Sequence, residues 1–324
     1  MQQKIKAGGM EKRKLGNTDF WVSPLCFGTL TIGPRQKNFP PAEGEALIRY
    51  ALDMGINFFD SAEIYGTYPY LRMALRGRRT DVVVAAKSYA VTAAEMKKSV
   101  EKARRELDME MIPLFLLHEQ ESAATLRGHR GALEYLLEAK EKGLVGAVGL
   151  STHTVAGVRA GALHPGIEVI HPLYNLKGWG IQDGGPEEMA EAIALAVTMG
   201  KGIYLMKALA GGHLSGEAEK ALRFALDLPG ISAVAVGMQS REEIALNYQI
   251  ACGGNPTPAL REKVRTRPRR LFIESWCRGC GRCVKRCPFG ALKLCNGKVQ
   301  VDYQACLACG YCSEACDIMA IKVL

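Results

Sequence analysis

The first 250 or so residues alternate two patterns of apolar and polar positions. Short, almost wholly apolar runs are typical of strands buried on both faces in a parallel sheet. Eight such runs occur, at residues 24–29, 56–60, 81–87, 112–118, 146–151, 167–171, 202–207 and 231–236. Between them, apolar residues recur every three or four positions, which predicts amphipathic helices at residues 42–55, 92–107, 132–143, 187–200 and 241–251.

This alternation predicts an α/β fold, a (β/α)8 TIM barrel over residues 10–260. Residues 14–22 alternate around an Asn-Thr-Asp turn, and we expect an N-terminal β-hairpin that plugs the barrel's N-terminal mouth. A doubly wound sheet is the alternative fold. It is disfavoured because no Gly-x-Gly-x-x-Gly follows the first strand.

Composition and charge limit the function classes. No apolar stretch reaches the ~18 residues of a membrane span, and the polar tail at residues 1–9 lacks the apolar core of a secretory signal, so we predict a cytoplasmic protein. The formal net charge is +9, and part of the excess lies at residues 261–271. We interpret this run as a solvated basic linker, with a patch for an acidic redox partner as the alternative. No recognition motif supports nucleic-acid binding.

Cysteines are concentrated at the C-terminal end. The chain has 11 cysteines, and nine of them follow residue 276. They form the pattern C-x2-C-x2-C-x3-C twice, 29 residues apart, and Ala291-Leu292-Lys293 recurs as Ala320-Ile321-Lys322. The segment is therefore an internal duplication, and its density favours a metal site over disulfides.

The spacing is typical of [4Fe–4S] ligation, in which the fourth cysteine of each run ligates the other cluster. The predicted ligands are Cys277, Cys280, Cys283 and Cys316 for the first cluster, and Cys306, Cys309, Cys312 and Cys287 for the second. Residues 272–324 resemble a bacterial two-cluster ferredoxin, which implies a small α+β ferredoxin-like domain. A pair of zinc sites is the alternative, although zinc knuckles usually have a longer gap between two C-x2-C pairs.

Polar residues end three neighbouring strands of the predicted barrel, where active sites of this architecture lie. Asp60, Lys87 and His118 end the second, third and fourth strands, and Tyr65 follows five residues after Asp60. Each alone has an ordinary structural explanation. Together they predict a proton donor: an ammonium lowers the pKa of a phenol from about 10, a carboxylate holds the ammonium, and an imidazole orients a carbonyl.

Residues 11–252 resemble the aldo-keto reductase family. The resemblance rests on the four residues above in strand order and on the segments KLGNTDFWVSPLCFGT, GLVGAVGLSTH and YNL. It implies that Asp60, Tyr65, Lys87 and His118 are the family's catalytic tetrad.

The resemblance also implies a nucleotide site at the barrel mouth. Nicotinamide contacts map to Ser151, Thr152 and His171, and the usual stacking aromatic maps to Met206. The remaining predicted cofactor-binding residues are Gly28, Thr29, Lys207, Gly211, Gly212, Gly237, Gln239 and Ser240. The family's cations for the 2′-phosphate map to Gly237 and Glu243, so NAD(H), NADP(H) and a flavin nucleotide all stay open.

The combined hypothesis is an iron–sulfur oxidoreductase that reduces a carbonyl or oxidises an alcohol of a small-molecule substrate, with electrons exchanged through two clusters. Because clusters carry single electrons and carbonyl reduction needs two, a flavin is a better converter than a nicotinamide. A redox protein such as a ferredoxin is a candidate partner. The alternative is an electron-transfer protein whose barrel is only a docking scaffold.

Metal analysis tests the cluster prediction. Protein purified without oxygen should be brown and contain about eight iron atoms and about eight sulfides per chain, as two cubanes require. A colourless protein with stoichiometric zinc would contradict it.

Overall fold

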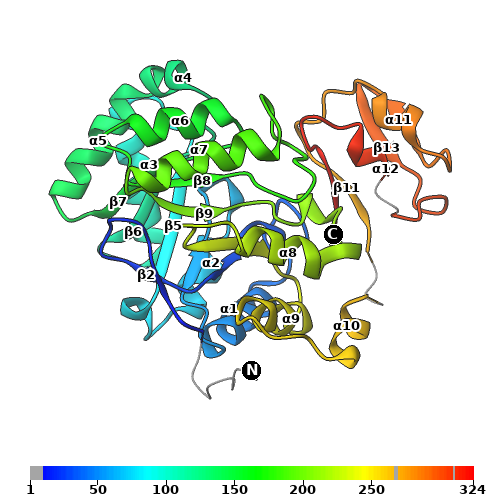
Figure 1. The fold of residues 1–324 in the computed structure, drawn as a ribbon, viewed down its shortest axis with the longest axis horizontal. Helices are drawn as coiled ribbons and strands as arrows, with labels where there is room; N and C mark the ends of the chain where they lie inside the picture. The colour runs from blue at the N-terminus through cyan, green and yellow to red at the C-terminus, as the bar shows by residue number, and fades with distance from the viewer. Residues whose placement is uncertain (1–9, 266–268, 309–310) are drawn as a thin grey trace.

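The computed structural model describes residues 10–265, 269–308 and 311–324. All eight predicted strands are present, and they close into a parallel barrel in chain order, with the last strand paired to the first. The strands are β3 (Leu25–Gly28), β4 (Phe58–Asp60), β5 (Val83–Ser88), β6 (Ile112–Leu117), β7 (Val145–Thr152), β8 (Val169–Pro172), β9 (Gly202–Leu205) and β10 (Ala233–Gly237). Closure confirms the barrel and rules out the doubly wound alternative (Figure 1).

Helices surround the barrel, and the five predicted ones are among them (Figure 1). The α-helices are α1 (Pro41–Asp53), α2 (Tyr68–Ala74), α3 (Ala93–Leu107), α4 (Ala123–Gly128), α5 (Arg130–Glu141), α6 (Val155–Leu163), α7 (Pro186–Thr198), α8 (Ala218–Leu226) and α9 (Arg241–Ala251). Short 3-10 turns are η1 (Thr29–Thr31), η2 (Glu63–Tyr65), η3 (Arg79–Asp81), η4 (Ala210–Gly212) and η5 (Ser215–Glu217).

The predicted N-terminal hairpin is present. Strands β1 (Arg13–Lys14) and β2 (Trp21–Val22) pair antiparallel. Its apolar residues Leu15 and Val22 are fully buried and pack with the inward-facing side chains of the barrel, including Phe58 and Tyr204. The hairpin therefore caps the barrel interior, as the sequence pattern predicts.

The C-terminal module consists of two antiparallel strand pairs and two short helices. Its elements are β11 (Leu271–Ile273), α11 (Arg282–Arg286), β12 (Leu292–Cys295), β13 (Lys298–Val301), α12 (Tyr311–Glu314) and β14 (Ile321–Val323). Strand β11 pairs with β14 and β12 with β13, so the module is α+β as predicted.

The predicted basic linker begins inside a helix. Its first five residues, 261–265, belong to α10 (Pro258–Arg265), and Arg261 is paired with Glu219 at 2.9 Å. Residue 271 already begins β11. Residues 266–268 of the linker, the tail at 1–9 and Cys309 lie outside the described residues. The predicted domain limits stay predictions.

The module contacts the barrel at the carboxyl ends of the strands. The imidazole of His213 donates from Nε2 to the Ile321 carbonyl at 2.7 Å, and its Nδ1 lies 2.8 Å from the Ser313 hydroxyl. Gln36 donates to the Glu274 carboxylate at 3.0 Å. Strand β14 lies so close to the barrel that a Cβ at Gly212 would be 1.9 Å from the Val323 carbonyl oxygen. The backbones can meet only because residue 212 is glycine.

None of the helices in the described residues is long and apolar enough to cross a membrane.

The contact at Gly212 predicts that two glycine-to-alanine substitutions differ in their effect on stability. Gly212 has φ +92° and no room for a Cβ, whereas a Cβ at Gly216 would meet nothing within 4 Å. We expect Gly212→Ala to cost roughly 1–3 kcal/mol and to lower the melting temperature of the cluster-loaded chain by several degrees, because β14 must move away. Gly216→Ala should leave it nearly unchanged. Equal melting temperatures for the two variants would show that the close contact between β14 and Gly212 contributes nothing to stability.

Candidate active site and cluster sites

The structure brings the four predicted catalytic residues to one rim of the barrel. Asp60 ends β4, Tyr65 ends the η2 turn that follows, Lys87 lies in β5 and His118 follows β6. The Lys87 ammonium is 2.5 Å from an Asp60 carboxylate oxygen and 5.3 Å from the centroid of the Tyr65 ring. The Tyr65 and His118 rings meet edge to face, with centroids 5.9 Å apart.

Asp60 is the most connected residue of this site. Its Oδ2 accepts from Lys87 and from the hydroxyl of Tyr204 at 3.0 Å, and lies 3.6 Å from Nε2 of His171. Lys87 also donates to the Ser61 carbonyl at 2.8 Å. These groups are buried, so the ion pair is shielded from water. The hydrogen bonds from Tyr204 and to the Ser61 carbonyl offset the cost of burying it.

Tyr204 was not predicted from the sequence. It lies inside the apolar run of β9 and stacks on His171, with ring centroids 3.8 Å apart. The available signal was period-two alternation: Tyr204 shares the inner face of the barrel with small and aliphatic side chains, where a hydroxyl needs a polar partner.

The protonation states differ in one respect from the prediction. Burial raises the pKa of the Tyr65 phenol well above its ordinary value, and the Asp60 carboxylate adds to the rise. The net shift of this pKa is therefore opposite to the lowering expected from Lys87, because burial has the largest effect on it. Tyr65 carries its proton at neutral pH.

Both imidazoles at the site are neutral. Burial, aided by the Lys87 charge, lowers the pKa of His118 well below its ordinary value, and burial lowers that of His171 to about 4. Nδ1 of His118 is buried and has no hydrogen-bond partner among the described residues. Tyr89 stacks on the same ring at 4.2 Å.

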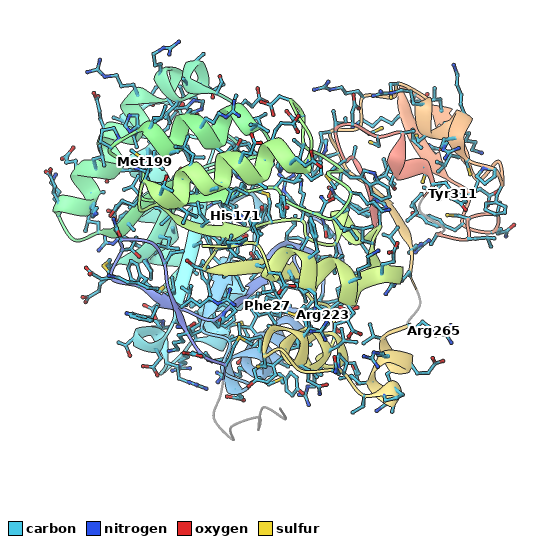
Figure 2. All side chains as sticks on the ribbon, viewed as in Figure 1. Phe27, His171, Met199, Arg223, Arg265 and Tyr311 are labelled. Carbon is cyan, nitrogen blue, oxygen red and sulfur yellow. The ribbon has the colours of Figure 1, made fainter. Side chains whose placement is uncertain are left out.

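A cavity of about 210 Å³ opens above Asp60 and Tyr65. Figure 2 labels His171, which lines this cavity from inside the barrel. The predicted cofactor-binding residues that line it are Gly28, His171, Met206, Lys207, Gly211, Gly212, Gly237 and Gln239.

Four predicted cofactor-binding residues have other partners and do not line the cavity. Thr29 donates to the Asp60 carbonyl at 2.9 Å, and the Ser151 hydroxyl accepts from the Glu119 amide. Thr152 is bonded to Thr154, and Ser240 caps α9. A cofactor role for these four stays a prediction.

The C-terminal module supplies part of the cavity wall, which the sequence did not reveal. Arg269, Lys322, Val323 and Leu324 line it. Lys322 is only 4% exposed, and burial, together with the Lys207 ammonium, lowers its pKa to about 7. Nothing in the repeated Ala-Leu-Lys and Ala-Ile-Lys segments distinguishes this lysine from its exposed counterpart Lys293.

The thiols of the first predicted cluster site lie near enough to one another to affect the pKa of Cys283. Burial raises the pKa of Cys283, and the charges of Cys316, Cys277 and Cys280 raise it further. Cys316 therefore lies within electrostatic reach of Cys283, which is 33 positions earlier in the chain. Backbone and side-chain bonds from Arg282 lower the pKa of Cys280, which favours the ligating thiolate. This donor set fits a cubane.

The second predicted site has three of its four ligands around one small cavity. Cys287, Cys306 and Cys312 line it together with apolar side chains such as Leu292. Cys287 comes from the first half of the repeat and the others from the second, as the predicted crossing requires. Among the described residues, no three His, Cys, Asp or Glu side chains are arranged closely enough to hold a single metal ion, and Cys309 lies outside those residues.

The comparison with protein families gives separate matches for the barrel and for the C-terminal module. Residues 24–224 match the model of the aldo/keto reductase family. The chain belongs to the aldo/keto reductase family. Residues 271–317 match a 4Fe-4S dicluster domain, which implies two clusters.

Relatives of the reductase barrel cover about three-quarters of this chain. An uncharacterized oxidoreductase of Bacillus subtilis is 22% identical over 75% of this chain and 91% of its own length, and L-galactose dehydrogenase of Arabidopsis thaliana is 24% identical over 74% and 87%. A solved structure from Pseudomonas aeruginosa, classed as an aldo-keto reductase, is 30% identical with a TM-score of 0.64, covering 75% of this chain and 94% of that one. An aldo-keto reductase of Bacillus halodurans (22%, TM-score 0.66, covering 79% and 95%) shares the fold.

The ion pair of this reductase barrel predicts a non-additive pair of substitutions. Asp60→Asn leaves the Lys87 ammonium buried without a counter-charge, and we expect it to cost about 3–5 kcal/mol of folding free energy. Adding Lys87→Met removes the charge as well, so the double variant should be more stable than Asp60→Asn alone. Urea unfolding followed by circular dichroism measures both. Additive losses would contradict the coupling.

Proposed function

We propose that this aldo/keto reductase interconverts a carbonyl and an alcohol at Asp60, Tyr65, Lys87 and His118, and exchanges the electrons through its two clusters. The observation that carries the proposal is the shared cavity: Asp60 and Tyr65 line it from the barrel, and Lys322 lines it from the dicluster module. Lys322 follows the predicted cluster ligand Cys316 by six residues. A scaffold that merely carried the module would not need its C-terminal strand at the catalytic cavity.

The proton chemistry follows from the protonation states. Reduction of a ketone or aldehyde to an alcohol adds two electrons and a proton to carbon, as hydride, and a second proton to oxygen. Tyr65 holds a proton and lines the cavity, so it supplies the proton to oxygen. The neutral His118 orients the same oxygen, and Lys87, held by Asp60, stabilises the phenolate that forms.

The cavity has features that fit a phosphate-bearing nucleotide. Lys207 is a half-buried lysine in its wall, and its side-chain nitrogen lies 3.1 Å from the His153 ring, which burial keeps neutral. His171, Met206 and Gly237 are the lining residues that would hold the redox ring and its linker. A bound nicotinamide supplies hydride, and a bound flavin supplies hydride and also exchanges single electrons. We favour the flavin for this reason and keep NAD(H) and NADP(H) as alternatives.

A small redox protein such as a ferredoxin is the proposed electron partner. The cavity of the second predicted cluster site is bordered by Phe289 and Leu307, which are 45% and 67% exposed. An exposed apolar border beside a cluster is suited to a transient redox contact.

Tyr65→Phe tests the catalytic assignment. Chain with chemically reduced clusters is mixed anaerobically with a panel of aldehydes and ketones, with FMN, NADH or NADPH added in turn. Cluster absorbance and alcohol formation are followed together. We expect Tyr65→Phe to slow alcohol formation about 10²–10⁴-fold, because the proton donor is lost, with unchanged cluster spectra.

Tyr135→Phe, on helix α5 outside the cavity, is the matched control. Full activity in Tyr65→Phe would refute the catalytic role. If none of the carbonyls oxidises the reduced clusters of the parent protein, the result would instead favour the electron-transfer scaffold.

A further inference from the structure

We infer that Lys322 of the dicluster module and Lys207 of the barrel together bind the phosphate of a redox nucleotide, so that the cluster module completes the cofactor site. The inference deepens the proposed function, because it rests on the same cavity being the cofactor site. It adds a recognition residue that comes from outside the barrel.

Two lysines line this cavity, Lys322 buried and Lys207 half-buried. Lys207 contacts a neutral imidazole, and Lys322 donates to the Met319 carbonyl at 2.6 Å. Among the described residues, no ion pair joins either ammonium to a carboxylate, although Glu119 and Glu274 act on both from a greater distance. A phosphate in the cavity would accept hydrogen bonds from both amino groups and favour their charged forms, so this wall of the cavity is suited to an anion.

The local backbone brings the two lysines to the same wall. Lys207 has φ +57°, a left-handed conformation that is unfavourable for residues other than glycine. A Cβ at Gly211 would lie 3.2 Å from the Lys322 ammonium, so the lysine lies flat against the loop that follows β9. The two ammonium groups repel each other across this loop, and a phosphate beside them would remove the repulsion.

The internal duplication provides a natural comparison for Lys322. The equivalent lysine, Lys293 in β12, is exposed to solvent and does not line the cavity. The repeat therefore explains why a lysine follows each cluster motif, and docking on the barrel explains why only one of them is buried. Lys293 is a matched control for charge, repeat position and distance from the cysteines in sequence.

The chemistry shared by the candidate ligands is a phosphate group. It belongs either to the terminal phosphate of a flavin mononucleotide or to the pyrophosphate of a nicotinamide dinucleotide. The probes are therefore FMN and NADH, each paired with a relative that lacks phosphate: riboflavin and nicotinamide riboside. Inorganic pyrophosphate tests the subsite by itself.

The experiment measures binding of these probes to the full cluster-loaded chain by anaerobic isothermal titration calorimetry. We expect Lys322→Gln to weaken binding of the phosphate-bearing probe by about 10–100-fold, the range for loss of a charged hydrogen bond, and to leave riboflavin and nicotinamide riboside unaffected. Lys293→Gln should bind like the parent. The probe that shows the effect identifies which nucleotide the cavity takes.

Three outcomes would overturn the inference. They are parent-like phosphate binding by Lys322→Gln, equal weakening of riboflavin or nicotinamide riboside binding, and absence of binding of all five probes to the parent. Iron content and melting temperature confirm that Lys322→Gln is folded. If it melts early, Lys322→Met, which keeps the length of the side chain, replaces it. If the parent protein reduces no carbonyl, the proposed function is refuted, but the effect of Lys322→Gln on phosphate binding still tests this inference.

Discussion

The candidate active site depends on one buried carboxylate. Asp60 receives hydrogen bonds from Lys87 on β5 and Tyr204 on β9 and lies beside His171 on β8, so it ties together strands from opposite sides of the barrel interior. Because a buried charge must be compensated, these partners cannot move independently. The same constraint keeps the Lys87 ammonium beside the ring of Tyr65, the proposed proton donor.

The second cavity wall has a different origin. Strand β14 approaches the barrel through Gly211 and Gly212, which have no side chains to hold it away, and His213 fixes it with bonds to Ile321 and Ser313. The module is thus attached by backbone proximity, by the hydrogen bonds of a neutral imidazole, and by Met319, which packs in an apolar cluster with Leu173 and Leu214 of the barrel. Gly211 and Gly212, which were predicted to bind a phosphate, are thus also the residues against which the C-terminal module packs.

Much of the fold was predictable because it is local. Buried strands and amphipathic helices leave periodic signals, and the strand ends identified Asp60, Tyr65, Lys87 and His118. Helices α2 and α6 gave no such signal, because α2 is seven residues long and α6 is mostly small apolar residues. The contributions of Tyr204 and Lys322, and the raised pKa of Tyr65, depend on contacts between distant segments, which periodicity and spacing do not encode.

Docking of β14 also removes the equivalence of the two halves of the duplicated module. The Cys316 thiol influences Lys322 in the wall of the catalytic cavity, whereas the cavity around Cys287, Cys306 and Cys312 is bordered by exposed apolar side chains. The two copies of the repeat therefore have different surroundings: one copy borders the cavity above Asp60 and Tyr65, and the other borders exposed apolar side chains. The burial of Lys322, but not of Lys293, marks this difference between them.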